Sequence, residues 1–380
     1  MSVSVGSRLA NILPDALKYA SLRRRATVDQ VVASGLQLGG IFTWGIVQGR
    51  FTAELLGSKI SSACEKEILP ARFPSAPPGI KVLQPLPSGD ASIAGFRAAG
   101  EHGEPLRLMM SLPIESEKLS ADIRLVEYMV GMLPRHSHYI SKADLVTLIE
   151  DIAYAAALDG DLAEEARGLH VGKQSDWFEA PRAVLHSNNL LVVTDLAGVP
   201  IEDLPAEQRA DIYCRAVANW SRLLLDDGIL NVTLRRDRLL IQEAKLGLTR
   251  WAGTRPSSSA AQLIRNLVLA SFGLTDAARE TARDQAAQLL ADGLGMEGAM
   301  DEIEAFCLSL ISENEQLTLK RRNFKQVVAR QSNRYSQEQR VDMFQLLRQL
   351  VWLRDLGLAC GVADLSRPWQ ELAQELSGSW

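Results

Sequence analysis

Apolar residues recur every three or four positions over much of the chain, which is the spacing that one buried face of an α-helix requires. This pattern predicts helices over residues 7–20, 28–66, 117–133, 143–169 and 205–226. After Pro256 the helical pattern continues to about residue 358. The chain is therefore expected to be mainly helical, with its longest helical region at the C-terminal end.

Short apolar runs separated by turn residues predict β-hairpins in the middle of the chain. One pair of strands is expected over residues 92–96 and 106–110, and another over residues 183–194 around Ser187-Asn188-Asn189. Residues 228–249 form a further hairpin-like region. The proline-rich segment from Pro70 to Pro87 excludes helix and marks a boundary.

The order of these elements predicts an α+β protein in three parts. A helical N-terminal extension is expected over residues 1–69, a small α+β lobe over 70–200 and a large helical lobe over 201–380. With 380 residues the chain is long enough for two domains or for one large two-lobed unit.

Composition excludes several classes of function. Hydrophobic residues make up 47% and charged residues 23%, which is typical of a globular protein, and the net charge of −5 does not indicate a nucleic-acid-binding surface. The four cysteines are far apart and have no histidine at metal-ligand spacing, so neither a zinc site nor a disulfide framework is expected. Scattered buried thiols fit a reducing compartment, and we expect a cytoplasmic protein.

One uncharged stretch, from Gln30 to Gly49, is long enough to span a bilayer. It contains three glutamines and several glycines, which favours a buried helix. The arginines at 23–25 follow the first expected helix, and a basic helix of this kind leaves peripheral contact with a membrane surface open as an alternative.

Four short motifs lie in the order that is found in a known family. They are Ala91-Ser92-Ile93-Ala94, the segment from Leu106 to Pro113, the segment from Asp161 to Ala166, and the segment from Leu191 to Asp195 followed by Gly198-Val199-Pro200. Over roughly residues 28–253 they resemble the UbiB/AarF atypical kinase-like family, with its alanine-rich nucleotide loop, lysine-bearing strand, glutamate-bearing helix and hinge. The resemblance implies a protein-kinase-like two-lobed fold with a helical N-terminal extension and a large helical C-terminal lobe.

The residues that carry chemistry in that family are replaced in this chain. The lysine that binds phosphates falls on Met109, the catalytic aspartate on Thr233 and the metal-binding aspartate on Lys245. Glu165, the partner of the lost lysine, is kept, and the asparagine expected shortly after it is Gly168.

Two further positions complete the site that the resemblance implies. Gln48 is what remains of the family's lysine–glycine–glutamine motif, in a helix that covers the nucleotide, and Asp195 ends the hinge strand. The degenerate nucleotide pocket therefore consists of Gln48, Ala91, Ser92, Met109, Glu165, Asp195, Thr233 and Lys245. Without its lysine, Glu165 is expected to be an exposed helix residue or, alternatively, to pair with Lys245 in a structural ion pair.

These replacements remove the positive charge that steadies phosphates and the carboxylates that hold Mg²⁺. We therefore predict a catalytically dead pseudokinase with no catalytic residue, no cofactor and no metal. By resemblance, it would be an accessory protein for a biosynthetic enzyme, or for an apolar small molecule of a quinone-type or secondary-metabolite pathway.

Two alternatives remain open at this point. One is an unorthodox nucleotide-binding kinase or ATPase in which Glu165, Lys245 and Glu243 rebuild the site. The other is a helical enzyme or regulator of another class.

Overall fold

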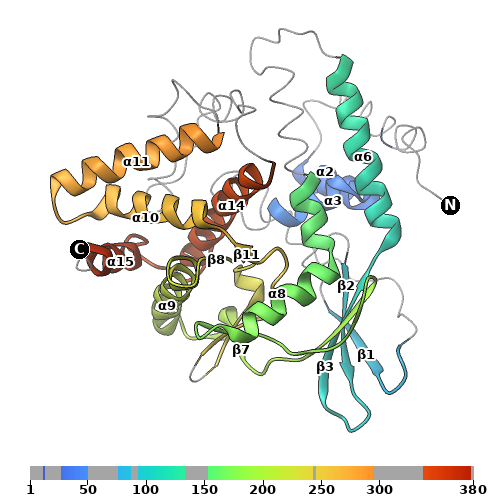
Figure 1. The fold of residues 1–380 in the computed structure, drawn as a ribbon. Helices are drawn as coiled ribbons and strands as arrows, with labels where there is room; N and C mark the ends of the chain where they lie inside the picture. Colours follow the sequence, from blue (N-terminus) through green and yellow to red (C-terminus); the bar gives the residue numbers. More distant parts are fainter. Residues whose placement is uncertain are drawn as a thin grey trace.

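The computed structural model describes residues 12, 27–49, 76–86, 93–132, 153–242, 245–294 and 337–377. Helices and sheets are both present, and almost all strand pairs are antiparallel, as the predicted α+β class requires. Figure 1 shows strands β1 (Lys81–Leu86), β2 (Ile93–Ala99) and β3 (Pro105–Ser111) at one end of the molecule, and the C-terminal helices on the other side of α8 (Leu162–Gln174).

Two short helices, α2 (Val28–Leu38) and α3 (Ile41–Gly49), stand where one continuous helix was predicted. The break falls at Gly39 and Gly40, whose φ angles of 70° and 63° are positive and cannot belong to a right-handed helix. The start of α2 is defined by Thr27, whose hydroxyl accepts a hydrogen bond from the first helical turn in a capping box. The rest of the predicted helix, beyond residue 49, lies outside the described residues.

The larger sheet contains both hairpins that the sequence predicts. Its strands are β1 (Lys81–Leu86), β2 (Ile93–Ala99), β3 (Pro105–Ser111), β5 (Ala183–Ser187) and β6 (Leu190–Thr194), in the antiparallel order β1-β2-β3-β6-β5. The β2–β3 and β5–β6 hairpins confirm the predictions.

Strand β1 lies inside the segment from Pro70 to Pro87, which was predicted to exclude helix and to mark a boundary. It tolerates Pro85 because it is an edge strand, where a missing N–H need not break a ladder between two neighbours. The described residues of this segment contain no helix, as predicted, but the strand at residues 81–86 was not expected.

Helix α6 (Pro113–Met132) follows β3 and confirms the helix predicted over 117–133. The helix predicted over 143–169 is divided: residues 153–160 form one helix and α8 (Leu162–Gln174) another. The division falls at Asp161, whose carboxylate accepts hydrogen bonds from two backbone N–H groups at the start of α8. Residues 143–152 are outside the described part.

A second sheet is smaller. It contains β4 (Phe178–Glu179), β10 (Leu246–Leu248), β9 (Leu239–Ile241) and β7 (Val199–Pro200), in that order. The predicted hairpin-like region thus yields the β9–β10 hairpin, whereas β8 (Ile229–Leu230) pairs with the later strand β11 (Arg255–Pro256). Short 3-10 helices precede α9 and β9, at Ile201–Asp203 and Arg236–Arg238.

The described residues after Pro256 are mainly helical, as predicted, whereas residues 295–336 lie outside the described part. The described helices of the C-terminal part are α9 (Ala206–Leu225), α10 (Ser258–Phe272), α11 (Asp276–Leu294), α14 (Gln337–Ala359) and α15 (Arg367–Ser377). Helix α10 packs against α11, α14 and α15 (Figure 1). Within the described ranges, no helix combines the length and the apolar character that a membrane span requires.

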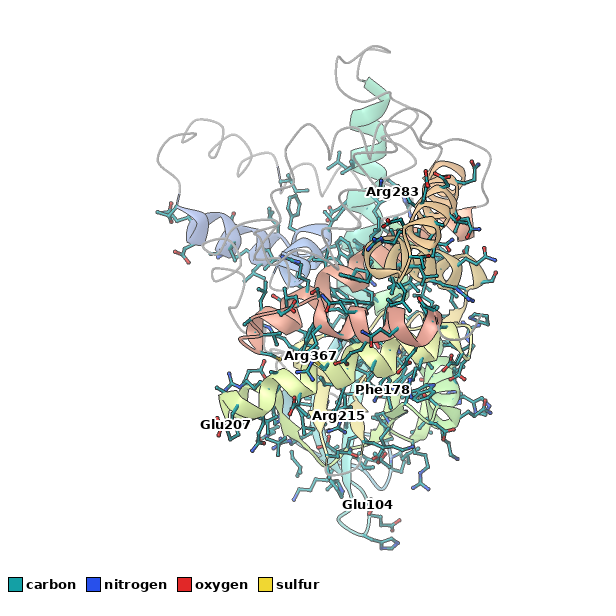
Figure 2. The ribbon with its side chains drawn as sticks, turned by 90° about the vertical axis from the view of Figure 1, so that its left-hand side faces the viewer. Glu104, Phe178, Glu207, Arg215, Arg283 and Arg367 are labelled. Carbon is teal, nitrogen blue, oxygen red and sulfur yellow. The ribbon has the colours of Figure 1, made fainter. Side chains whose placement is uncertain are left out.

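The main hydrophobic core joins the larger sheet to the C-terminal helices. One continuous cluster extends from Ile93 on β2 to Ala373 on α15, across the boundary predicted at residue 200. Phe178 lies in this core, where its ring meets that of Trp251 edge-on. Figure 2 shows Glu104 at the outer tip of the β2–β3 turn. The opposite face of the sheet has a separate hydrophobic cluster. Its buried members are Ala94, Phe96, Ala98, Leu106, Leu108 and Val192. The predicted division into three parts stays a prediction.

Candidate functional site

Glu165 on α8 forms the centre of a buried polar site. Its side chain is 0% exposed, and its Oε2 accepts a hydrogen bond from Arg250 Nε at 2.8 Å. Its Oε1 accepts one from the backbone N–H of Trp251 at 2.6 Å. The expectation of an exposed Glu165 is therefore wrong, because the fold covers the carboxylate and supplies donors for both of its oxygens.

Glu165 forms a buried ion pair, but its partner is Arg250 and not Lys245. Lys245 lies at the start of β10 with an exposed side chain, whereas Arg250 follows β10 and is 9% exposed. The pair with Lys245 is therefore wrong. The fold turns Arg250 inward and leaves the lysine in solvent, where a charged ammonium keeps its hydration.

Glycines on α8 allow this close approach. A Cβ added at Gly168 would lie 1.9 Å from the carbonyl oxygen of Trp251, and one at Gly172 would lie 2.6 Å from the Trp251 ring. Glu165, Gly168 and Gly172 are spaced three and four residues apart, so they share one face of the helix. No asparagine side chain fits at position 168, because the backbone of Trp251 occupies the space.

Thr233 is joined to the same ion pair through the backbone of Arg250. It is 1% exposed, and its hydroxyl lies 2.5 Å from the Arg250 carbonyl oxygen and 2.9 Å from Asn231 Oδ1. Asn231 also accepts the backbone N–H of Thr233 at 2.9 Å and donates to Thr254 Oγ1 at 3.2 Å. The Thr233 hydroxyl thus connects the segment that contains Asn231 to the segment that contains Arg250.

The segment that contains Thr233 is held from both sides. On α14, Gln349 accepts the backbone N–H of Leu234 at 3.2 Å and donates to its carbonyl oxygen at 2.7 Å. On α9, Trp220 donates its indole N–H to the Asn231 carbonyl oxygen at 2.8 Å. These groups are buried, so the loop is fixed by bonds that water cannot replace.

Asp159 extends the network to the N-terminal helices. Both of its carboxylate oxygens accept from Arg348 on α14, at 2.7 and 3.0 Å, and one also accepts from the indole N–H of Trp44 on α3 at 3.2 Å. A terminal nitrogen of Arg250 lies 3.5 Å from the Asp159 carbonyl oxygen. Three regions far apart in sequence therefore converge on this one aspartate.

Comparison with known proteins does not identify a family for this chain. No family model matches the chain, and no curated protein gives a significant match. A solved structure described as the complex of Rv3197 with erythromycin, from Mycobacterium tuberculosis, is similar with a TM-score of 0.47 and 16% sequence identity, over 98% of this chain and 90% of that chain. A likeness at this level carries no conclusion about function.

The other predicted site residues are not gathered around Glu165 in any described contact. Met109 on β3 is 4% exposed and belongs to the hydrophobic core, and Asp195 forms an ion pair with Arg107 at 2.9 Å beside the same strand. Gln48 belongs to α3, and its side chain is outside the described part. Ala91, Ser92 and Glu243 also lie outside the described residues. Of the predicted residues whose side chains the structure describes, Glu165 and Thr233 are linked, through Arg250.

The residues that complete this site were missed by sequence reasoning. Arg250, Asp159, Arg348 and Gln349 have no local motif, because each acts through a partner far away in the chain. Only Asn231 carries a signal, since an asparagine two residues before a threonine is typical of a side chain that bonds its own loop. Among the described residues, no group of three or more His, Cys, Asp and Glu side chains could hold a metal ion.

Proposed function

We propose that this protein is a catalytically inactive, kinase-like accessory protein whose former nucleotide site is closed by the Glu165–Arg250 ion pair. Kinase-type transfer needs a lysine on the phosphates, a glutamate that positions this lysine, and carboxylates that hold Mg²⁺. Glu165 has both oxygens engaged by Arg250 and Trp251 and is inaccessible to solvent. This is the observation that carries the proposal.

The energetic consequence can be estimated from the burial of the pair. Any use of Glu165 for a lysine or a metal would first break its bond with Arg250, and opening a buried pair costs about 3–5 kcal/mol. Such a cost lowers affinity by at least about 100-fold, because each 1.4 kcal/mol corresponds to a factor of ten. The ion pair therefore opposes nucleotide binding even if the surrounding lobes are kinase-like.

Thr233 also supports the proposal that the protein is catalytically inactive. A general base needs a group that takes the substrate proton near neutral pH, and a buried hydroxyl bonded to a backbone carbonyl does not do so. The proposed role is therefore binding: the protein would serve a partner enzyme or hold an apolar small molecule, with its polar network acting as a structural brace.

The test is calorimetric titration of the full chain with ATP, with and without Mg²⁺. We expect no heat of binding up to millimolar nucleotide. Micromolar binding would refute the closed site, and loss of that binding in Lys245→Ala would support a site rebuilt around this exposed lysine. The accessory role would be contradicted if the protein is isolated from its source as a bare monomer without ligand or partner.

A further inference from the structure

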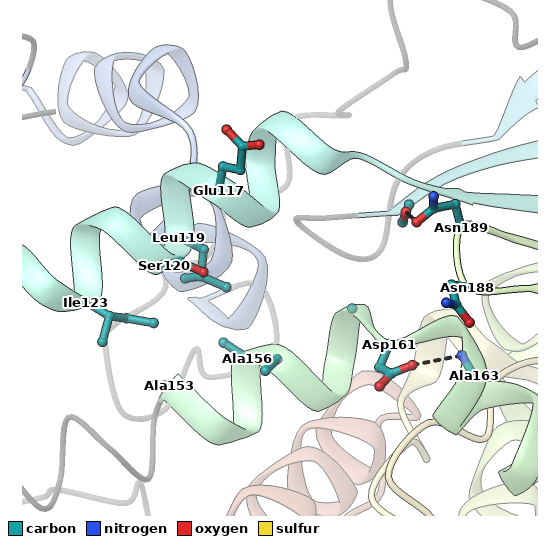
Figure 3. A pocket seen from close by; sticks show the side chains of 13 residues that line it. Glu117, Leu119, Ser120, Ile123, Ala153, Ala156, Asp161, Ala163, Asn188 and Asn189 are labelled. Carbon is teal, nitrogen blue, oxygen red and sulfur yellow. Dashed lines mark hydrogen bonds between the residues drawn. The ribbon is translucent and has the colours of Figure 1, made fainter. Parts of the chain in front are cut away.

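A cavity of about 580 Å³ lies beside α8, and none of the predicted site residues that the structure describes lines it. It is bounded by the first half of α6, the helix at 153–160, the start of α8 and the β5–β6 turn (Figure 3). Its volume falls within the range of about 300–1,000 Å³ that is typical of small-molecule sites.

One end of this cavity is mainly apolar, with Ser120 as a polar lining residue. Leu119 and Ile123 on α6 line it from one side, and Ala153, Ala156 and Ala157 line it from the other. Figure 3 shows Ile123 and Leu119 above Ala153 and Ala156, on two helices that run past each other. Because alanines extend so little from their helix, they leave space for a compact apolar group.

The other end is polar and is rigidly built. Asn189 accepts hydrogen bonds from the backbone N–H and the hydroxyl of Ser111, at 3.0 and 3.1 Å, so the β5–β6 turn is fixed against the end of β3. Asp161 uses Oδ1 for both cap bonds of α8, at 2.8 and 3.1 Å. Asn188 lies on the same side of the cavity as Asp161 (Figure 3). Amide and carboxylate oxygens are therefore placed together at this end.

The charge of the lining is one-sided. The charge comes from Asp161, since Figure 3 shows the Glu117 side chain turned away from Asp161 on the outer side of α6, and none of the described lining residues is basic. A concave surface with charges of one sign raises the local concentration of the opposite charge. The lining therefore favours a cation and disfavours an anion.

We propose that this cavity binds an amphipathic small molecule with a compact apolar body and a cationic, hydrogen-bond-donating head group. The body lies between α6 and the helix at 153–160, and the head lies against Asp161 and Asn188. This proposal deepens the proposed function, on which it rests for its biological role, because it names the class of small molecule that the protein would hold.

Three probes with one apolar cage separate the contributions of body and head. They are 1-aminoadamantane, 1-adamantanol and 1-adamantanecarboxylate, whose rigidity keeps the entropy cost of binding low. Titration of the full chain, followed by ligand-observed NMR, should show the amine binding about fivefold more tightly than the alcohol, and the carboxylate binding most weakly. Equal affinities for the amine and the carboxylate, or no binding of any probe at 10 mM, would overturn the proposal.

Three variants test whether the probes bind in this cavity. Asp161→Asn keeps an oxygen for the α8 cap, so it should fold normally and lower the affinity for the amine to that for the alcohol. Glu164→Gln removes the same charge from the same turn outside the cavity lining, and it should leave the affinity for the amine unchanged. Ala157→Trp, at an exposed position of the lining, should abolish binding of all the probes. Unchanged binding in Ala157→Trp would place the probes elsewhere and refute the site.

The failures of the two proposals are distinguishable. The ATP titration depends on Glu165 and Arg250, which do not line the cavity. Binding of ATP together with the amine would refute only the closed nucleotide site. Absence of both would refute only the cavity proposal.

Discussion

The buried Glu165–Arg250 pair predicts a large and specific loss of stability when one partner is removed. The two side chains are 0% and 9% exposed, and their contacting atoms are 2.8 Å apart. Two unit charges about 4 Å apart interact by about 4 kcal/mol at an effective dielectric constant of about 20. Measured costs of opening buried pairs, about 3–5 kcal/mol, are of the same size.

The substitutions Glu165→Gln and Arg250→Met isolate the charge. Glutamine keeps an oxygen for the backbone N–H of Trp251, and methionine keeps much of the apolar stem of the arginine. Each single variant should lose about 3–4 kcal/mol of unfolding free energy, since each leaves a buried charge without its counterion. The double variant leaves no such charge, so its loss should be smaller than the sum of the single losses by about 2 kcal/mol.

Urea unfolding, followed by tryptophan fluorescence and by far-UV circular dichroism, measures these losses. The two probes should report the same transition, as a single cooperative unit requires. Glu375→Gln is the matched control, because the Arg222–Glu375 pair is 42% and 58% exposed and should contribute less than about 1 kcal/mol. Single losses below about 1 kcal/mol, or strictly additive losses in the double variant, would refute the reasoning.

Two further predictions concern packing and pH. Gly168→Ala should lose roughly 3 kcal/mol in the same assay, because its Cβ would meet the Trp251 carbonyl oxygen at 1.9 Å. Gly45→Ala, with nothing within 4 Å, should instead gain about 0.5–1 kcal/mol. Burial raises the pKa of the Cys360 thiol from 9.0 to about 12, so the unfolded chain ionises first and stability falls as pH rises from 9 towards 12. Cys360→Ala should lose this part of the pH dependence, and an unchanged pH profile would contradict the assignment.

Local features were predicted well where a single pattern decides the structure. The β2–β3 and β5–β6 hairpins follow from short apolar runs around polar turns, and α9 follows from its repeating apolar face. The errors lie where a local signal was overlooked or outweighed. Asp161 is a helix cap that divides a long helical pattern, and the segment around Pro85 was taken only as a boundary without helix, although an edge position allows the strand β1 there.

The predictions about the site were also right in some respects and wrong in others. The sequence singled out Glu165 and Thr233 as positions of interest through a family resemblance, and the kinase-like fold that it implies remains a prediction. It assigned Glu165 the wrong surroundings, because exposure depends on what packs over the helix. Nothing in the residues around Glu165 indicates that its partner stands 85 positions later in the chain.

By itself, the sequence determined the helical and hairpin elements, since hydrophobic periodicity and turn residues act over a few neighbouring positions. Only the tertiary structure decided which charges are buried and which partners they have. Arg348 meets Asp159 across 189 positions, and the cavity beside α8 is lined by residues of β3, α6, the helix at 153–160, α8 and the β5–β6 turn. Such contacts form when packed elements exclude water, and the energy of a buried charge depends on this packing more than on its neighbours in sequence.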